Sequence, residues 1–297
     1  MTRLVGAIEA GGTKFVLALT TMEGSIVDRT RIETGKPVET LKAVGDWFHS
    51  SQDRHGNIKA FGVASFGPIG IDARSGDYGT FLTDVKPGWK GSRFQDVLGS
   101  FGVPIAIDTD VNGAALGEAI SGAGRGKSVV AYTTVGTGIG SGVVKNGVPV
   151  SGLSHYEAGH LRVPHDHEID PFEGVCAYHG DCCEGLASGP AIKARWGGDL
   201  STLDDPDKTA LIGEYLGNLA ATLAAFHMPE ILVFGGGVLK TPGLLGSIRH
   251  AMHRSLAGYL AYYDRDLSEI VVAPQLGDDA GITGAAALGR IVLEKQA

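Results

Sequence analysis

All three cysteines of the 297-residue chain lie within the stretch CAYHGDCCE, which runs from Cys176 to Glu184 and also holds a histidine. Cys176, His179 and Cys182 are spaced three residues apart, with small and turn-forming residues between them. Two thiolates and one imidazole at this spacing suit tetrahedral zinc, and a reactive thiol or plain packing is the alternative. A fourth ligand must come from elsewhere, and the upstream histidines within reach are His155, His160, His165 and His167.

A disulfide is a poor explanation of this cluster. The N-terminus, MTRLVGAIEAGG, has only a short apolar run that passes into glycines, so we expect no secretory signal. Eighteen apolar residues nowhere follow one another, so we expect no membrane span. We therefore expect a cytoplasmic protein, and in a reducing compartment clustered thiols more often bind metal or take part in catalysis.

Charge and composition narrow the class of protein. A net charge of -8 argues against binding to nucleic acid, because the phosphate backbone attracts a basic surface. The charge gives no sign of binding to a membrane surface either. With 43% hydrophobic residues the chain can bury a sizeable core, in two domains or one large one.

Glycines gather at the ends of apolar runs. Residues 4–8 are apolar, EAGGT follows at 9–13, and residues 15–19 are apolar again, which predicts a strand, a tight turn and a second strand. Residues 129–135, the glycine run 136–142 and residues 143–144 repeat this order, so the same unit is predicted twice. A third glycine run, 235–237, follows the apolar strand predicted over 231–234.

These glycine loops are candidates for phosphate binding. The run GTGIGSG is neither a dinucleotide loop, because a strand rather than a helix follows it, nor a Walker loop, because no Lys-Ser/Thr pair ends it. Glycine hairpins can still present backbone N–H groups to phosphate oxygens, with hydroxyl donors from Thr13 and Thr137. Either loop alone could be a plain β-turn, but the three glycine runs together favour a bound nucleotide.

Asp110 is the candidate for proton transfer. It follows the apolar strand predicted over 103–107 and opens a helix of small residues, so its carboxylate can lie in a cleft. A carboxylate at that place could take the proton from an attacking hydroxyl group. An aspartate before such a helix could equally be its N-cap, and the residues alone leave both interpretations open.

Apolar residues at helical spacing fill the intervals between the predicted strands. One stripe comprises Leu211, Ile212, Tyr215, Leu216, Leu219 and Leu223. A second comprises Leu244, Leu245, Ile248, Met252, Leu256 and Leu260. Strands that alternate with such helices predict the α/β class. We expect a domain boundary near Gly117, with domains over 1–117 and 118–280.

Five segments together resemble, in order, the landmarks of the ROK sugar kinases of the actin-like ATPase superfamily. They are EAGGTK at 9–14, TDVN at 109–112, GTGIG at 136–140, EAGH at 157–160 and the cysteine stretch. The resemblance extends from about residue 6 to residue 284. The motif SFGP at 65–68, the form Cys-x-x-His-Gly-x-Cys and the run EGLASGP at 184–190 resemble most the bacterial fructokinase branch.

The resemblance implies a two-domain α/β fold of the actin-like ATPase (ribonuclease H-like) type, with a cleft between the domains and a helix at about 281–297 returning to the first. It implies ATP-dependent phosphorylation of a hexose at the 6-hydroxyl, D-fructose above others, with Asp110 as general base. Glu9, where most relatives carry aspartate, would contact Mg²⁺ through water, the alternative being a solvated acid at a strand end. The residues implied to bind ATP and its Mg²⁺ are Glu9, Gly11, Gly12, Thr13, Lys14, Thr134, Gly136, Thr137, Gly138, Gly235, Gly236 and Gly237.

The resemblance also assigns the sugar and zinc ligands. The implied sugar-binding residues are Gly67, Pro68, Asp110, Asn112, Glu157 and Glu184, while Thr109 stands where the family usually has asparagine. The implied zinc ligands are His160, Cys176, His179 and Cys182, a closed structural site. Such a metal would hold Glu157 and Glu184 in register, and Cys183 would pack in the core.

Several alternatives accompany this hypothesis. Glucokinase, mannokinase and N-acetylmannosamine kinase belong to the same family, and a sugar pocket separates them by hydroxyl geometry. A sugar-responsive repressor would need a helix-turn-helix domain before the loop at Glu9, where we expect no room for one. A zinc hydrolase would need an open position on the metal. We expect a homodimer with hexose and ATP as its small-molecule partners.

Overall fold

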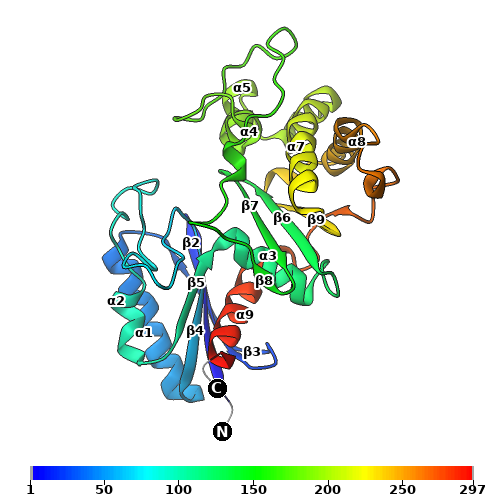
Figure 1. The fold of residues 1–297 in the computed structure, drawn as a ribbon. Helices are drawn as coiled ribbons and strands as arrows, with labels where there is room; N and C mark the ends of the chain where they lie inside the picture. Colours follow the sequence, from blue (N-terminus) through cyan, green and yellow to red (C-terminus); the bar gives the residue numbers. More distant parts are fainter. Residues whose placement is uncertain (1–2, 296–297) are drawn as a thin grey trace. The chain divides into compact units, whose positions relative to one another are not determined.

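The computed structural model describes residues 3–295, which divide into two compact units. Unit 1 comprises the residues up to Ser121, residues 149–155 and the residues from Asp278 onward. Unit 2 comprises residues 122–148 and 156–277. Each unit holds one five-stranded sheet with helices (Figure 1), which confirms the predicted α/β class.

The sheet of unit 1 has the strand order β3-β2-β1-β4-β5. Its strands are β1 (Leu4–Ala10), β2 (Lys14–Thr21), β3 (Ile26–Glu33), β4 (Ile58–Ser65) and β5 (Ile105–Thr109). β1 pairs antiparallel with β2 across a short turn, as the glycine pattern predicts, whereas β1, β4 and β5 run parallel. The strand predicted over 103–107 is displaced by two residues, because β5 begins at Ile105, directly after Pro104, which has no backbone N–H for a ladder hydrogen bond.

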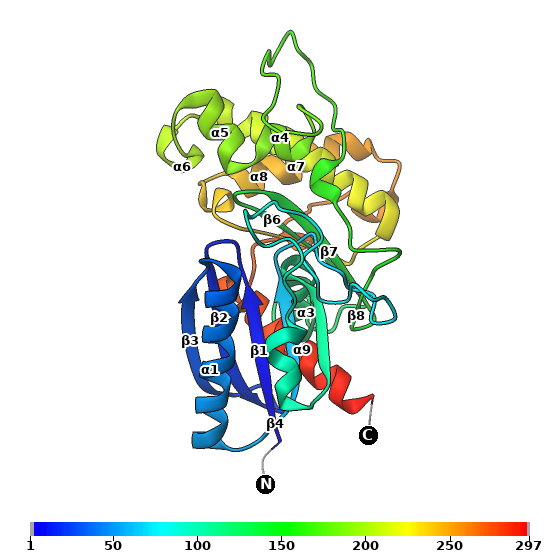
Figure 2. The same cartoon turned by 90° about the vertical axis from the view of Figure 1, so that its left-hand side faces the viewer.

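Helices cover both faces of this sheet (Figures 1 and 2). On one face α1 (Pro37–His55) and α2 (Gln95–Leu98) enclose an aromatic core that includes Phe15, Phe48 and Phe61. On the other face α3 (Asp110–Ser121) and α9 (Ala280–Glu294) pack against β4 and β1. A Cβ at Gly284 would lie 1.7 Å from the carbonyl oxygen of Gly113, so glycine allows α9 to approach α3 this closely.

The sheet of unit 2 has the strand order β10-β9-β6-β7-β8. Its strands are β6 (Val129–Val135), β7 (Ile139–Lys145), β8 (Val148–Pro149), β9 (Ile231–Gly235) and β10 (Val271–Val272). β6 and β7 form the second predicted strand-turn-strand unit, and β9 is the predicted strand before the third glycine run. The sequence pattern therefore finds the strands that end in glycine loops.

The two predicted helical stripes lie on α7 (Pro206–His227) and α8 (Leu244–Leu256). These helices pack closely because Gly213 faces Ser247 and Gly217 faces Ala251. The prediction that the second stripe extends to Leu260 is wrong, since Ala257 and Gly258 adopt φ angles of 49° and 75° that end the helix.

The remaining helices of the described chain are short: α4 (Cys183–Ala187), α5 (Gly189–Trp196), α6 (Leu200–Leu203), η1 (Gly99–Phe101), η2 (Ala158–His160), η3 (Val238–Lys240), η4 (Ala261–Tyr263) and η5 (Gly277–Asp279). Within residues 3–295, every helix is too short or too polar to cross a lipid bilayer.

Candidate active site and metal centre

In unit 1, strand register brings several predicted site residues to one edge of the sheet. Ala10 at the end of β1 pairs with Ser65 at the end of β4, and Ser65 pairs with Thr109 at the end of β5. The segments 9–13, 65–68 and 109–112 therefore emerge side by side at the carboxyl ends of parallel strands. Ligands of α/β proteins commonly bind at such an edge. The sequence motifs on these segments thus meet because of β-sheet pairing alone.

Asp110 is the first residue of α3, but a neighbouring residue performs the capping. The hydroxyl Oγ1 of Thr109 accepts a hydrogen bond from the backbone N–H of Asn112 at 3.2 Å, as an N-cap side chain does. The carboxylate of Asp110 accepts from the N–H of Val111 at 2.9 Å. Thr109, which departs from the family's usual asparagine, therefore has a local structural role that the sequence did not reveal.

Asp108 is a second residue that sequence reasoning missed. Its Oδ1 accepts hydrogen bonds from the side-chain amide of Asn112 at 2.7 Å and from the N–H of Thr109 at 2.8 Å. Burial raises the pKa of Asp108, and these hydrogen bonds oppose that rise. Asp108 therefore fixes the rotamer of Asn112. A polar residue at the end of a buried strand, two positions before Asp110, was the signal that could have identified it.

Glu9 lies near the end of β1 in an unusual electrostatic environment. Burial, and next the charge of Asp110, raise the pKa of Glu9 to about 7, although Lys14 and Arg29 act in the opposite direction. Among residues 3–295, its Oε2 is buried without a hydrogen-bond partner. A hydrated Mg²⁺ would supply both a positive charge and a donor to this oxygen, so the residues present fit that ion. Gly281 leaves the space that Glu9 occupies, since a Cβ there would lie 2.6 Å from the Glu9 carboxyl carbon.

The first glycine loop is held by its own backbone. The N–H of Gly11 donates to the carbonyl of Lys14 at 3.0 Å, and the hydroxyl of Thr34 donates to the carbonyl of Gly11 at 2.8 Å. Within the described chain, a Cβ built at Gly12 would meet no heavy atom within 4 Å. Gly12 and Thr13 are exposed. The loop is therefore preformed and open on the side where a phosphate group could approach.

Gly67 and Pro68 follow β4 at the same edge of unit 1. The carbonyl of Pro68 accepts a hydrogen bond from the N–H of Leu82 at 2.9 Å, and the N–H of Phe66 donates to the carbonyl of Ala10 at 2.7 Å. A Cβ at Gly67 would lie 3.4 Å from the ring of His155. The structure thus places this predicted sugar-binding pair beside the strand that carries Glu9, with His155 close to it.

In unit 2, the other two glycine loops lie together. β6 and β9 are parallel, and Thr134 pairs with Gly235, so loops 136–138 and 235–237 leave the sheet at neighbouring positions. Gly236 has a φ of 93°, and a Cβ there would lie 2.4 Å from the carbonyl oxygen of Val135. Only glycine fits this crossing of two loops. Six of the predicted nucleotide-binding residues are on these two loops, and Thr134 lies on β6, which leads into the first of them.

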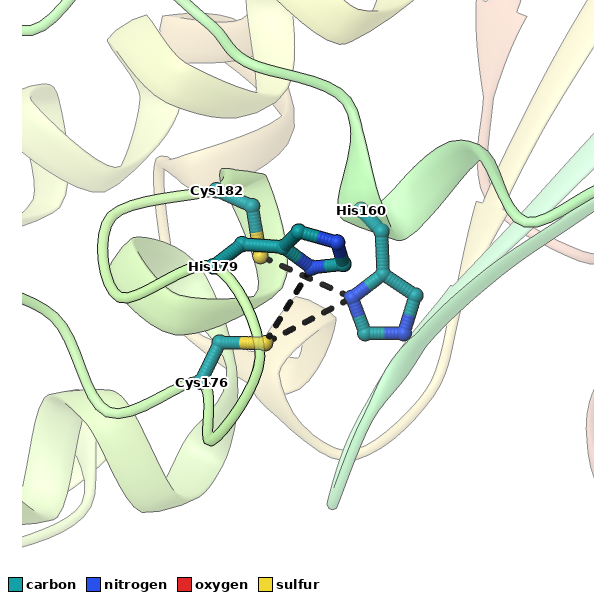
Figure 3. Close-up of side chains that lie close together, drawn as sticks. All are labelled: His160, Cys176, His179 and Cys182. Atoms are coloured by element: carbon teal, nitrogen blue, oxygen red, sulfur yellow. Dashed lines mark hydrogen bonds between the residues drawn. The ribbon is translucent and has the colours of Figure 1, made fainter. Parts of the chain in front are cut away.

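The four predicted zinc ligands come together in unit 2 (Figure 3). Donor atoms of His160, Cys176, His179 and Cys182 all lie within 4.8 Å of one another. The Nδ1 of His160 lies 3.6 Å from both thiol sulfurs, and the Nδ1 of His179 lies 3.5 Å from the sulfur of Cys176. Tetrahedral zinc, with Zn–S of about 2.3 Å and Zn–N of about 2.0 Å, requires sulfur–nitrogen separations of about 3.5 Å. The observed separations fit a zinc ion.

Backbone contacts shape the loop that carries the thiols. Cys176 and Gly180 exchange two backbone hydrogen bonds of 3.2 and 2.9 Å, which closes a tight turn around His179. Gly185 is required behind it, because a Cβ there would lie 1.9 Å from the carbonyl oxygen of Gly180. Cys183 points away, as expected: it is fully buried, its sulfur lies 3.9 Å from the carbonyl oxygen of Tyr215, and burial raises its pKa.

Glu184 connects this cluster with the second glycine loop. Its Oε2 accepts a hydrogen bond from the N–H of Ile139 at 2.8 Å, at the start of β7. Its Oε1 lies 4.0 Å from Nε2 of His160, the ring nitrogen opposite the one that faces the thiols. Imidazole ligands of zinc are commonly oriented by a carboxylate in this position. Glu157 is exposed and directly precedes η2, which ends at His160.

Comparison with known proteins matches these motifs to one family. A family model described as the ROK family matches residues 5–291. The chain belongs to the ROK family. It is 41% identical, over 96% of each chain, to a fructokinase of Zymomonas mobilis.

Two solved ROK structures have a similar fold. One is the ROK hexokinase of Thermus thermophilus, with a TM-score of 0.81, 26% identity, and 98% of this chain and 99% of that chain covered. The other is a ROK glucokinase of Streptomyces griseus in complex with glucose and AMPPNP, with a TM-score of 0.74 and 26% identity over 97% of this chain and 99% of that one. The two α/β units of this ROK chain therefore represent the actin-like ATPase fold, as the resemblance implied.

Proposed function

We propose that this ROK chain is a fructokinase that transfers the γ-phosphoryl group of ATP to the 6-hydroxyl of D-fructose. The observation that carries the proposal is the 41% identity to a fructokinase over nearly the full length of both chains. Glucokinase, mannokinase and N-acetylmannosamine kinase are alternatives within the family.

Asp110 is the general base of the proposed reaction. Its carboxylate takes the proton of the 6-hydroxyl as the oxygen forms a bond to the γ-phosphorus, and the bond to the β-phosphate oxygen breaks to release ADP. Thr109 Oγ1 accepts the capping hydrogen bond from the N–H of Asn112 at the start of α3. The helix therefore does not need the Asp110 carboxylate as its N-cap. Asp108 holds Asn112, which binds a sugar hydroxyl, in one rotamer.

The glycine loops bind the nucleotide in this proposal. Backbone N–H groups of residues 11–13, 136–138 and 235–237 donate to phosphate oxygens, and Lys14 neutralises part of the phosphate charge. Glu9 would hold Mg²⁺ through water, and this ion, when bound, neutralises charge on the β- and γ-phosphates. The buried Oε2 of Glu9, which has no hydrogen-bond partner among the described residues, supports that role.

The sugar is bound by two groups of residues. Gly67, Pro68 and Asn112 belong to unit 1, and Glu157 and Glu184 belong to unit 2. The cluster of His160, Cys176, His179 and Cys182 would hold a structural zinc ion with four protein ligands, a set that leaves no position for a reactive water. We further propose that the protein acts as a homodimer.

A coupled assay with ATP and a panel of hexoses tests the proposed function. Fructose should give the highest kcat/KM, and glucose, mannose and N-acetylmannosamine should give lower values. A higher value for any of these three would assign the chain to another branch of the family. Binding of sugar without turnover of any hexose would instead favour a non-catalytic, sugar-responsive regulator.

A further inference from the structure

A second group of metal-binding side chains lies in unit 2, apart from the four zinc ligands. Donor atoms of His165, His167 and Asp181 all lie within 4.8 Å of one another. The rings of His165 and His167 are close, with centroids 4.1 Å apart. The side chain of His165 is only 4% exposed, while His167 is exposed. The group therefore has one fixed ligand and one that can move to meet an ion.

The hydrogen bonds of His165 leave one of its nitrogens facing a carboxylate. Its Nε2 lies 2.9 Å from the carbonyl oxygen of Asp170, which can only accept, so Nε2 carries the proton. In the neutral ring Nδ1 then has a lone pair, and this atom lies 3.4 Å from Oδ2 of Asp181. A proton on Nδ1 or a bound cation can satisfy these two atoms, and a cation is the arrangement that also engages the neighbouring ring of His167. The same arrangement, one nitrogen on a carbonyl and the other on the ion, is usual for metal-binding histidines.

Neighbouring contacts fix both partners. The carboxylate of Asp170 accepts from the hydroxyl of Tyr215 at 2.6 Å and pairs with Arg195 at 3.1 Å, which holds the segment that carries His165. Arg162 pairs with Oδ1 of Asp181, so Oδ2 is the oxygen that faces His165. The arginine compensates part of the carboxylate charge. We therefore expect a site weaker than one with two thiolates.

We propose that His165, His167 and Asp181 form a second metal site that binds a divalent transition-metal ion such as Zn²⁺. Tetrahedral zinc with nitrogen and oxygen ligands at about 2.0 Å needs ligand separations of about 3.3 Å. The 3.4 Å between His165 and Asp181 already meets this requirement, and a rotation of the exposed His167 completes the set. Three protein ligands leave at least one position for water. Such an ion would tie the segment of His165 to the loop of Asp181, the residue before Cys182.

Cobalt titration of the zinc-loaded protein tests this site. After the thiolate site has been filled with one Zn²⁺, added Co²⁺ should bind with a stoichiometry of about one per chain. The visible bands of this Co²⁺ should lack sulfur-to-metal charge transfer, because the three ligands include no thiolate. Co²⁺ that shows sulfur charge transfer would have displaced the zinc and would count against a separate site.

Matched variants locate the bound ion. His167→Gln changes an exposed side chain, so the protein should stay folded, and it should weaken Co²⁺ binding at least about tenfold. Asp181→Asn, which keeps the side-chain shape, should weaken it as well. His253→Gln is the control, because His253 also lies 3.1 Å from an aspartate, Asp264, but belongs to no group of three ligands in the described chain. A wild-type protein that binds no ion beyond the first, or a His167→Gln variant that binds as the wild type does, would overturn the proposal.

Discussion

The two units position their candidate acids by different means. In unit 1, Glu9 and Asp110 lie at the ends of β1 and β5, and the hydrogen-bond register of three parallel strands sets their separation. In unit 2, Glu184 lies on a short helix beside the loop of the four proposed zinc ligands, and its Oε1 lies 4.0 Å from Nε2 of His160. Sheet register survives loss of a side chain, whereas a metal-held loop depends on every ligand. In unit 1, we therefore expect substitutions to lower activity strongly only at the acids themselves. In unit 2, we expect activity to fall also when a metal ligand that does not contact the substrate is replaced.

The largest effect should come from Asp110→Asn in unit 1. The amide keeps the size and the hydrogen bond to the N–H of Val111 but cannot take a proton. Turnover should fall at least about a hundredfold, while fructose and ATP still bind. Steady-state kinetics and calorimetry measure the two effects. A variant with near-normal turnover would show that Asp110 is not the base, and Thr109→Ser is the control that keeps the capping hydroxyl.

Loss of the metal should have the next largest effect, and it tests unit 2. Removal of zinc with a chelator, or Cys176→Ser, should loosen the contact between His160 and Glu184 and lower sugar affinity about ten- to a hundredfold. ATP binding and the cooperative unfolding of unit 1 should change little. Metal analysis beside sugar-binding calorimetry decides the question.

Cys183→Ser is the matched control for that experiment. Cys183 is a neighbouring thiol whose sulfur faces the carbonyl oxygen of Tyr215. The Cys183→Ser variant should therefore keep the metal and lose only a modest part of the free energy of unfolding. Normal sugar affinity in metal-free protein would contradict the role assigned to the cluster.

Two glycine variants should separate nucleotide from sugar binding, with smaller effects. Gly12→Val in unit 1 adds a side chain where no described atom lies within 4 Å, so it should weaken ATP binding about tenfold and leave sugar affinity unchanged. Gly138→Val in unit 2 is different, because its Cβ would lie 2.8 Å from Oε2 of Glu184. It should weaken the binding of both ligands. Calorimetry with each ligand alone measures the difference, and equal effects of the two variants on sugar would contradict it.

The smallest effect concerns the pH dependence of unfolding. The pKa of Glu9 is raised from its ordinary value of 4.5 to about 7 in the folded protein. The contribution of Glu9 to the free energy of unfolding is therefore fully present below pH 4.5 and is lost as the pH rises through 7. Glu9→Gln should therefore raise the melting temperature at pH 8 by about 2 to 4 °C and change it little at pH 4. Asp53→Asn, which changes an exposed carboxyl on α1, should leave the pH profile unchanged. If Glu9→Gln changed the melting temperature equally at pH 4 and pH 8, the result would contradict a buried Glu9 that ionises between these pH values.

Local patterns predicted several of the strands and helices but not the contacts made across the sheet edge. The apolar runs and glycine turns identified β1, β2, β6, β7 and β9, because their signals lie within a few adjacent residues. His160 was proposed as the fourth zinc ligand only through the family motif, since four histidines lay within reach. Asp108 and Thr109 escaped because their roles depend on how α3 begins after β5. Spacing along the chain cannot show that His165 and Asp181 meet, because tertiary packing brings them together.

The close packing of α9 against α3 and β4 has a consequence for biosynthesis. α9 follows residues 122–277 in the chain, so a ribosome delivers all of unit 2 before the helix that unit 1 needs. A Cβ at Gly62 of β4 would lie 1.8 Å from the carbonyl oxygen of Ala285, and the part of this sheet face that α9 covers stays uncovered until α9 emerges. Unit 2 can thus fold co-translationally while unit 1 waits. A nascent chain released before α9 would expose the apolar face of β1 and β4 and become a substrate for quality-control proteases, so incomplete translation products should not accumulate as half-folded protein.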